Sequence, residues 1–165
     1  MNVLRNVLAG FAGVLCMFMV ILGGEGVTGM VYPGTPAFKD ATTRYTEAMR
    51  AQDATAMHAA REDLRAQLAT WPMSANLLLV AGWALAALVG GGVAAFLAPH
   101  RACTMGLLLG ALVTLGIVVN QYALPHPIWM PIAGVVGALA CGLGAGVFVA
   151  TRHAKQKAKG HALPA

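Results

Sequence analysis

One acidic side chain, Glu25, is the strongest candidate for chemistry in the apolar part of this 165-residue chain. It follows the uncharged run Asn6 to Gly24 directly and is surrounded by Gly23, Gly24 and Gly26. A carboxylate at membrane depth marks a functional site by default, here for a proton or a cation. Near the interface, however, water hydrates a carboxylate, and a structural or topological role is the favoured interpretation.

Two further polar residues are expected on the same side of the membrane. Asn120 ends a second apolar run, and His126 follows it in a proline-containing segment. We predict that Glu25, Asn120 and His126 form a polar cluster, in which His126 changes charge near neutral pH. The apolar runs hold no second carboxylate, which argues against a relay between paired acids. One histidine and one acid are also too few ligands for a closed metal site, so no metal is predicted.

Other reactive residues are scattered in patterns that do not indicate catalysis. Cys16, Cys103 and Cys141 each lie in an apolar run without Cys-x-x-Cys spacing, which indicates packing residues. The sequence has no haem-attachment motif, and no serine or cysteine is recognisably paired with a base. We therefore predict a protein that is not an enzyme and binds no cofactor.

The composition indicates a membrane protein. Hydrophobic residues make up 58% of the chain, charged residues only 10%, and the mean hydropathy is +0.69. These values exclude a water-soluble enzyme with an ordinary charged surface. Four of the five net positive charges lie in one lysine-rich tail, not on a basic face interleaved with aromatic rings, so nucleic-acid binding is excluded as a main role.

The uncharged stretches have room for four membrane crossings, since a helix needs about 20 apolar residues to cross the hydrocarbon core. Pro72 and Pro99 bracket the second crossing, and the polar, proline-containing segment 120–127 divides the last uncharged stretch in two. The first crossing is interpreted as a retained anchor, not as a cleaved signal peptide. The predicted fold is an all-α integral membrane four-helix bundle with spans at about residues 6–24, 73–98, 102–120 and 128–151.

Residues 34–71, between the first two spans, are predicted to form an extramembrane helical loop. Thr35 and Pro36 supply a cap and a first helical residue, and Asp53 is placed to cap a second helix. A helical hairpin broken near Gln52 therefore competes with one long helix. An apolar stripe at helical spacing lies in the second half: Met57, Leu64, Leu68 and Trp71. The favoured role is a cap over the outer ends of the spans, and the alternative is a docking surface for another subunit.

Basic residues near the span ends indicate the orientation in the membrane. Arg5, Arg101 and the basic tail 152–165 are predicted to be cytoplasmic, whereas the loop 34–71 carries balanced charge and is predicted to be periplasmic. The expected location is the bacterial inner membrane, with both termini in the cytoplasm.

Small residues recur at four-residue spacing and favour close helix packing, because helix association in lipid depends on backbone approach. We expect most of them to be used within the bundle, with a neighbouring chain as the alternative. The predicted packing residues are Gly90 and Gly91 on the second span, Gly106, Gly110 and Thr114 on the third, and Ala138, Gly142 and Gly146 on the fourth.

Three short patterns resemble a family of short bacterial four-span membrane proteins that has no assigned activity. They are Glu25 followed by Tyr32-Pro33, Trp83-Ala-Leu-Ala leading to Gly90-Gly91, and the segment Pro125-His126-Pro127-Ile-Trp129. The resemblance implies the four-span topology. This chain departs from the family pattern at Thr28 and Gly29, where the family has Gly-His, and in its longer loop. The first departure weakens the case for an ion or metal site, and the second favours a partner-binding cap.

The sequence thus predicts a non-catalytic, multi-pass inner-membrane protein that acts through helix packing. It would be an accessory subunit of a larger membrane complex or a homo-oligomer, with membrane lipids and other subunits or itself as partners. The alternative is a small transporter or channel that uses Glu25 as a proton or cation site.

Overall fold

The computed structural model describes residues 2–124 and 126–161, and this part of the chain is almost entirely helical. Pro125 of the proline-containing segment and residues 162–165 of the tail lie outside the described residues. The predicted all-α fold is confirmed. The elements are α1 (Asn2–Val31), α2 (Pro36–Ala51), α3 (Ala54–Ala69), α4 (Met73–Leu97), the 3-10 turn η1 (Pro99–Arg101), α5 (Ala102–Ala123) and α6 (Trp129–His161).

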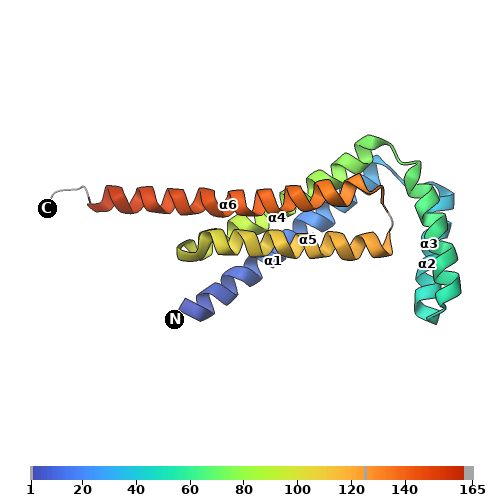
Figure 1. Cartoon of the computed structure of the whole chain (residues 1–165), viewed down its shortest axis with the longest axis horizontal. Helices are drawn as coiled ribbons and strands as arrows, with labels where there is room; N and C mark the ends of the chain where they lie inside the picture. Colours follow the sequence, from blue (N-terminus) through green and yellow to red (C-terminus); the bar gives the residue numbers. More distant parts are fainter. Residues whose placement is uncertain (1, 125, 162–165) are drawn as a thin grey trace.

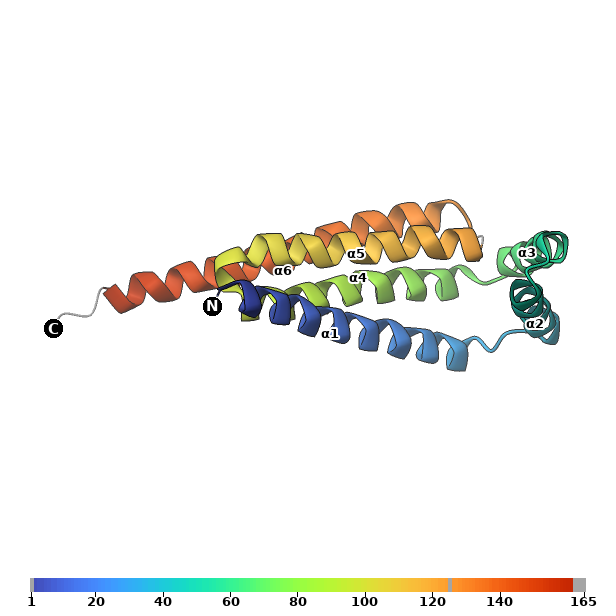
Figure 2. The same cartoon turned by 90° about the horizontal axis from the view of Figure 1, so that it is seen from below.

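Helices α1, α4, α5 and α6 form an elongated bundle, and the hairpin of α2 and α3 lies beyond one end of it (Figures 1 and 2). We call this the hairpin end. The start of α1 and the far end of α6 lie toward the opposite end (Figure 1). There the Arg5 guanidinium lies 2.8 Å from His100 Nδ1 and ties the start of α1 to η1. We call this the basic end, because Arg5, Arg101 and Arg152 belong to it.

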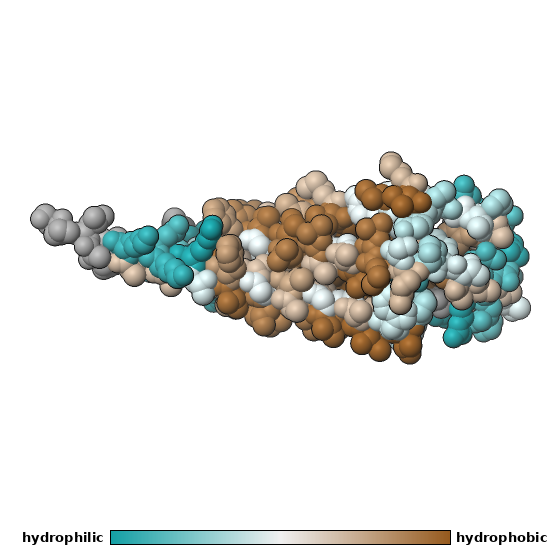
Figure 3. Space-filling model, turned by 90° about the horizontal axis from the view of Figure 1, so that it is seen from above, coloured by the Kyte–Doolittle hydropathy of each residue, from teal (hydrophilic) through white to brown (hydrophobic). Residues whose placement is uncertain are grey.

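The surface of the bundle is suited to lipid. Four helices are long and apolar enough to cross a membrane. Large apolar side chains such as Phe96, which is 74% exposed, point outward from them. Figure 3 shows an apolar middle between a hydrophilic hairpin and a hydrophilic end of α6. An apolar surface of this extent is unfavourable in water, so the protein is a multi-pass membrane protein.

Three helices are longer than the predicted spans. α5 continues to Ala123, although its span was expected to end at residue 120, so Asn120 lies inside the helix. α1 continues to Val31, although the span was expected to end at Gly24, so Glu25 lies inside the helix and not after it. Glycine disfavours a helix in water by about 1 kcal/mol per residue, but a backbone in lipid has no other hydrogen-bond partner and stays helical. α6 continues to His161, so the described part of the basic tail is also helical.

Residues 36–69 form a hairpin of two helices, and the alternative of one long helix is wrong. The Thr35 hydroxyl accepts from the Phe38 N–H at the start of α2, and Asp53 accepts from the N–H groups of Thr55 and Ala56 at the start of α3. Between the two helices, Gln52 adopts a left-handed conformation with φ of 55° and ends α2. Leucines and alanines are buried in the hairpin: Ala41, Ala48, Ala60, Leu64 and Leu68.

Helices α5 and α6 pack with their backbones in contact. A Cβ atom on Gly110 would lie 2.8 Å from the carbonyl oxygen of Ala138, and one on Gly146 would lie 2.6 Å from that of Ala102. Carbon atoms do not approach so closely, so only glycine fits at either position. The interface holds Gly106, Gly110, Ala138, Gly142 and Gly146.

Helix α4 joins this interface at Gly91. A Cβ on Gly91 would lie 3.3 Å from Gly106 Cα and 3.4 Å from Gly142 Cα, so three helices meet at three glycines. Thr114 does not bond across the interface, because its half-buried hydroxyl donates to the carbonyl oxygen of Gly110 on its own helix, over 3.0 Å.

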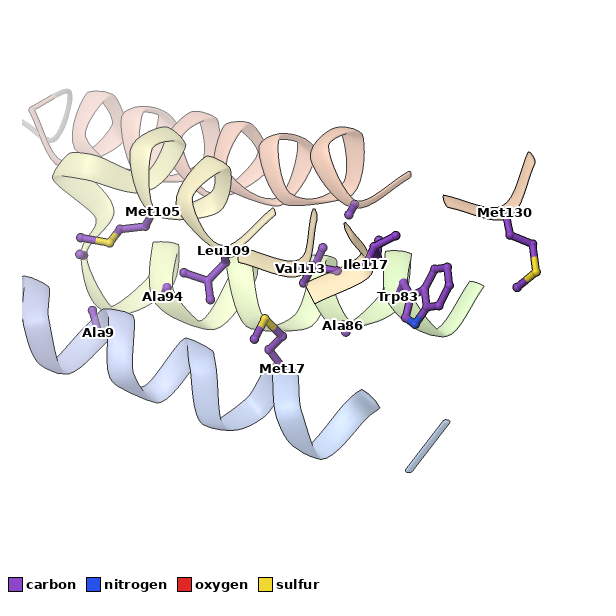
Figure 4. Close-up of a cluster of buried hydrophobic side chains, with 13 residues drawn as sticks. Ala9, Met17, Trp83, Ala86, Ala94, Met105, Leu109, Val113, Ile117 and Met130 are labelled. Carbon is purple, nitrogen blue, oxygen red and sulfur yellow. The ribbon is translucent and has the colours of Figure 1, made fainter. Parts of the chain in front are cut away.

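Helix α1 is attached to α4 by a separate crossing. A Cβ on Gly13 would lie 2.7 Å from the Gly90 carbonyl oxygen, and a Cβ on Gly90 would lie 2.8 Å from Met17 Cβ. α1 packs extensively on α4 and touches α5 only slightly. Figure 4 shows Met17 of α1 below the side chains of Leu109, Val113 and Ile117 on α5. α1 is therefore the most peripheral helix of the bundle.

Candidate functional site

His126 lies in the loop between α5 and α6 at the hairpin end, and Gln121 holds it there. The Gln121 side chain donates to the His126 carbonyl oxygen over 2.9 Å and accepts from the His126 amide N–H over 3.3 Å. The Gln121 amide group thus uses both its donor and its acceptor on the backbone of His126. Sequence reasoning placed Gln121 beside Asn120 but did not assign it to the candidate cluster.

The His126 imidazole is buried, with 8% of the residue exposed. It meets the Trp83 ring edge to face at a centroid distance of 6.3 Å. Desolvation by this burial lowers the pKa of His126 below its ordinary value of 6.5. The Asn120 side-chain nitrogen lies 3.4 Å from His126 Nε2, where it is placed to donate to a neutral imidazole. His126 Nδ1 has no partner among the described residues.

Glu25 does not join this contact. Its side chain is exposed on α1 and makes no hydrogen bond or ion pair within the described residues. Glu25 and Asn120 nevertheless line the same groove, from α1 and from α5. The structure therefore brings Asn120 and His126 together and places Glu25 on the opposite wall of a groove from Asn120.

This groove, which we call the α1/α5 groove, has a volume of about 490 Å³. It exists because α1 is attached to α4 and leaves a seam along α5. A Cβ on Gly116 would meet open space there. Its lining consists of Met17, Phe18, Ile21 and Glu25 on α1, Trp83 on α4, and Leu112, Val113, Leu115, Gly116, Ile117, Val119, Asn120 and Ala123 on α5.

The α1/α5 groove is apolar along most of its length and polar toward the hairpin end, where Glu25 and Asn120 lie. A carboxylate in such surroundings favours a ligand that offers a hydrogen-bond donor or a cation. The groove therefore fits an elongated apolar group with a donor at one end.

Sequence reasoning missed several polar contacts of the bundle. Asn76 on α4 is 4% exposed, and its Oδ1 has no partner among the described residues. Thr28 is buried, and its hydroxyl donates to the Gly24 carbonyl oxygen over 2.8 Å. Tyr32, the residue after α1, donates its hydroxyl to Ser74 Oγ on α4 over 2.7 Å. The available signal was an amide side chain at Asn76 in an otherwise apolar span.

The hairpin has its own polar surface. Arg44 on α2 and Asp63 on α3 form an ion pair at 3.0 Å, but both side chains are more than half exposed, so the pair contributes little stability. The extensive contacts of α2 and α3 are with each other. Whether the hairpin is a surface cap or a docking surface stays a prediction.

The fold and the groove define an α-helical multi-pass membrane protein with a seam that opens toward lipid. Among the side chains that the structure describes, in residues 3–124 and 126–159, no three of His, Cys, Asp or Glu gather as metal ligands would. The sequence matches no family model, and neither a curated protein nor a solved structure is significantly similar to it. The resemblance to short four-span bacterial proteins therefore stays a prediction.

Proposed function

We propose that the protein is a non-catalytic accessory subunit of a larger membrane complex, and that its α1/α5 groove receives a transmembrane helix of another subunit. The observation that carries the proposal is the 490 Å³ seam between two helices of one bundle. Helices in lipid associate through close packing, and Gly116 leaves room for a neighbouring backbone at this seam.

The polar end of the groove indicates which helix would bind. An unpaired carboxylate at membrane depth is unfavourable, so a partner helix with a Lys, an Arg or a hydroxyl donor opposite Glu25 gains binding free energy. The chain has no Lys or Arg within residues 6–38, 66–100 and 102–151. A second copy therefore offers only hydroxyl groups, such as that of Thr114, and no cation, which favours a different subunit with a Lys or Arg over a homo-oligomer.

The distribution of charge supports an orientation with both termini in the cytoplasm. Arg5, Arg101 and Arg152 belong to the basic end, and five lysines and arginines of the loop are balanced by five acids: Asp40, Glu47, Asp53, Glu62 and Asp63. The positive-inside rule then places the basic end in the cytoplasm and the hairpin in the periplasm of a bacterial inner membrane.

Photo-crosslinking in the native membrane tests the proposal. Gly116 is replaced by p-benzoylphenylalanine in the full-length protein, and the cells are irradiated before the membranes are solubilised. We expect one heavier adduct that contains a different membrane polypeptide, identified by mass spectrometry. The same probe at Gly144, which also faces open space but on another side of the bundle, is the matched control.

Two results would refute the accessory-subunit proposal. An adduct of twice the chain mass at position 116 would identify a homo-oligomer. Equal yields of polypeptide adduct at positions 116 and 144 would show that the groove has no dedicated occupant.

A small transporter or channel is the second candidate, favoured by the shared lining of Glu25 and Asn120 in one groove. In this mechanism, Glu25 would take up and release a proton or cation as α1 moves against α5. Purified protein in liposomes is assayed for proton and Na⁺ flux, with Glu25→Gln as the test variant and Glu47→Gln in the hairpin as the control. Equal flux through wild type and Glu25→Gln would exclude this role.

A further inference from the structure

A second groove lies on another side of the bundle, between α4 and α6. It consists of two adjoining hollows of about 560 and 300 Å³, which share Phe96, Phe148 and Val149 in their walls. The first hollow is lined by apolar residues and glycines only, among them Leu88, Gly92 and Gly144. The second continues toward the basic end, where its lining adds Pro99, Arg152, His153 and Gln156. We call the two together the α4/α6 groove.

Arg152 is positioned where the groove leaves the apolar zone. Its guanidinium lies over the Phe148 ring at 4.8 Å from the ring centroid, so the charge points back along α6 toward the membrane. Lys155 and Lys159 follow Arg152 at helical spacings of three and seven residues, which places them on the same side of α6. Arg152 therefore lies in the groove wall, and two further cations follow it along α6 beyond the groove.

Acidic side chains are absent from this part of the sequence. All six acidic residues lie between Glu25 and Asp63, so residues 64–165 contain none. Five of the six are in the loop beyond the hairpin end, and Glu25 is near the hairpin end of α1. No aspartate or glutamate is therefore near Arg152 in the sequence, and an anion from outside the chain can bind its guanidinium.

We propose that the α4/α6 groove binds an anionic glycerophospholipid. One acyl chain lies along the apolar hollow beside Gly92 and Gly144, and the phosphate group of the headgroup binds Arg152 at the groove end. An arginine guanidinium matches the geometry of a phosphate through parallel hydrogen bonds. The nearby lysines favour a headgroup with net negative charge over a zwitterionic one.

The two grooves carry opposite charges at their polar ends, and this difference indicates which groove binds a phospholipid. The α1/α5 groove ends in the Glu25 carboxylate, which repels a phosphate, whereas the α4/α6 groove ends in Arg152, His153 and Gln156. The phospholipid site is independent of the proposed accessory function, and either proposal holds if the other fails.

Native mass spectrometry of the delipidated, full-length protein tests the site. Phosphatidylglycerol and phosphatidylcholine with identical chains are added back in a mild detergent, and the bound lipid per chain is measured. We expect wild type to retain phosphatidylglycerol about tenfold more strongly, the size of one charge-assisted contact. Arg152→Gln is expected to lose most of this preference, while Lys39→Gln, which removes one charge in the hairpin, keeps it.

A second pair of variants tests the apolar hollow. A Cβ on Gly144 meets open space and one on Gly92 meets Ala145 Cβ at 3.9 Å, so Gly144→Leu and Gly92→Val fill the groove without disturbing the bundle. Both are expected to release bound phosphatidylglycerol, whereas Gly116→Leu, in the other groove, retains it. The proposal is overturned if wild type binds the two lipids equally, if both filled variants still hold phosphatidylglycerol as wild type does, or if a second protein chain appears in place of lipid.

Discussion

His126 combines a titratable ring with an environment that disfavours its charged form. The ring is buried against Trp83, its backbone is held on both sides by Gln121, and the nearest side-chain nitrogen is that of Asn120. An amide nitrogen is a donor, so it stabilises a neutral imidazole and opposes a protonated one. These contacts hold the loop between α5 and α6 against the end of α5. We expect their contribution to stability to depend on pH.

Acidification should weaken the fold through His126. Because burial lowers the pKa of His126 in the folded protein, the unfolded chain binds more protons once the pH falls below 6.5. The free energy of unfolding should therefore be retained above pH 6.5 and decline as the pH falls toward the folded-state pKa. Thermal unfolding in detergent at pH 7.5, 6.5 and 5.5 measures this. His126→Gln should flatten the dependence, while His58→Gln, on the exposed hairpin, should not; equal slopes for all three proteins would contradict the prediction.

At the scale of elements, the hairpin is organised by two neighbouring residues. Gln52 ends α2 in a left-handed conformation, and the Asp53 carboxylate accepts two backbone N–H groups at 3.0 Å to start α3. These N–H groups otherwise lack an intrahelical partner. Local capping therefore decides that residues 36–69 fold back as two helices.

Removing the Asp53 cap should destabilise the first turn of α3. Asp53→Ala is expected to cost about 1 kcal/mol locally, which corresponds to roughly fivefold faster amide exchange. Hydrogen exchange at Thr55 and Ala56 is the measurement. Asp40→Ala, an exposed residue within α2, is the control and should leave these two amides unchanged. Unchanged exchange in Asp53→Ala would mean that the carboxylate is not the cap in solution.

The α5/α6 interface gives a second prediction at this scale. A Cβ on Gly106 would collide with the Gly142 carbonyl oxygen, a backbone atom that cannot move without shifting the helix. Gly106→Val should therefore cost about 1–3 kcal/mol or more and lower the melting temperature in detergent. Gly144→Val, on the outside of the same helix pair, should be nearly neutral, because its Cβ meets open space. Equal losses in the two variants would show that the glycine contact is not what holds α5 on α6.

At the scale of the whole molecule, charge is separated along the long axis. A hydrophilic hairpin lies at one end, an apolar bundle lies in the middle, and a hydrophilic helix end extends at the other (Figures 1 and 3). The sequence gives the hairpin balanced charge and the end of α6 an excess of basic residues. Moving the charged hairpin or the basic end of α6 through lipid is unfavourable. The protein should therefore keep one orientation across the membrane after insertion.

Site-specific labelling tests this orientation. In a variant whose three native cysteines are alanine, Thr43→Cys in the hairpin should react with a membrane-impermeant maleimide in intact spheroplasts. Ala158→Cys near the end of α6 should react only after lysis. Labelling of both sites in intact spheroplasts, or the reverse pattern, would refute the proposed topology.

The sequence by itself determined the class of protein. Long uncharged runs made four helices unavoidable, because only an internally hydrogen-bonded backbone is stable in lipid. Local signals were sufficient where neighbouring residues interact, as at Thr35 and Asp53. They were insufficient for the length of α1, since Gly23, Gly24 and Gly26 end helices in water but not in an apolar environment.

Only the tertiary structure decided which polar residues meet and where the bundle is open. Asn120 and His126 are six residues apart and come together through the loop, whereas Glu25 is held at a distance because Gly13 and Gly90 fix α1 on α4. A hydropathy pattern specifies that a segment enters the membrane, but not which of its residues face lipid and which face a neighbouring helix. The neighbour of each residue depends on where the helices cross, and glycines fix those crossings. The resulting packing leaves one groove that contains Glu25 and another that contains Arg152.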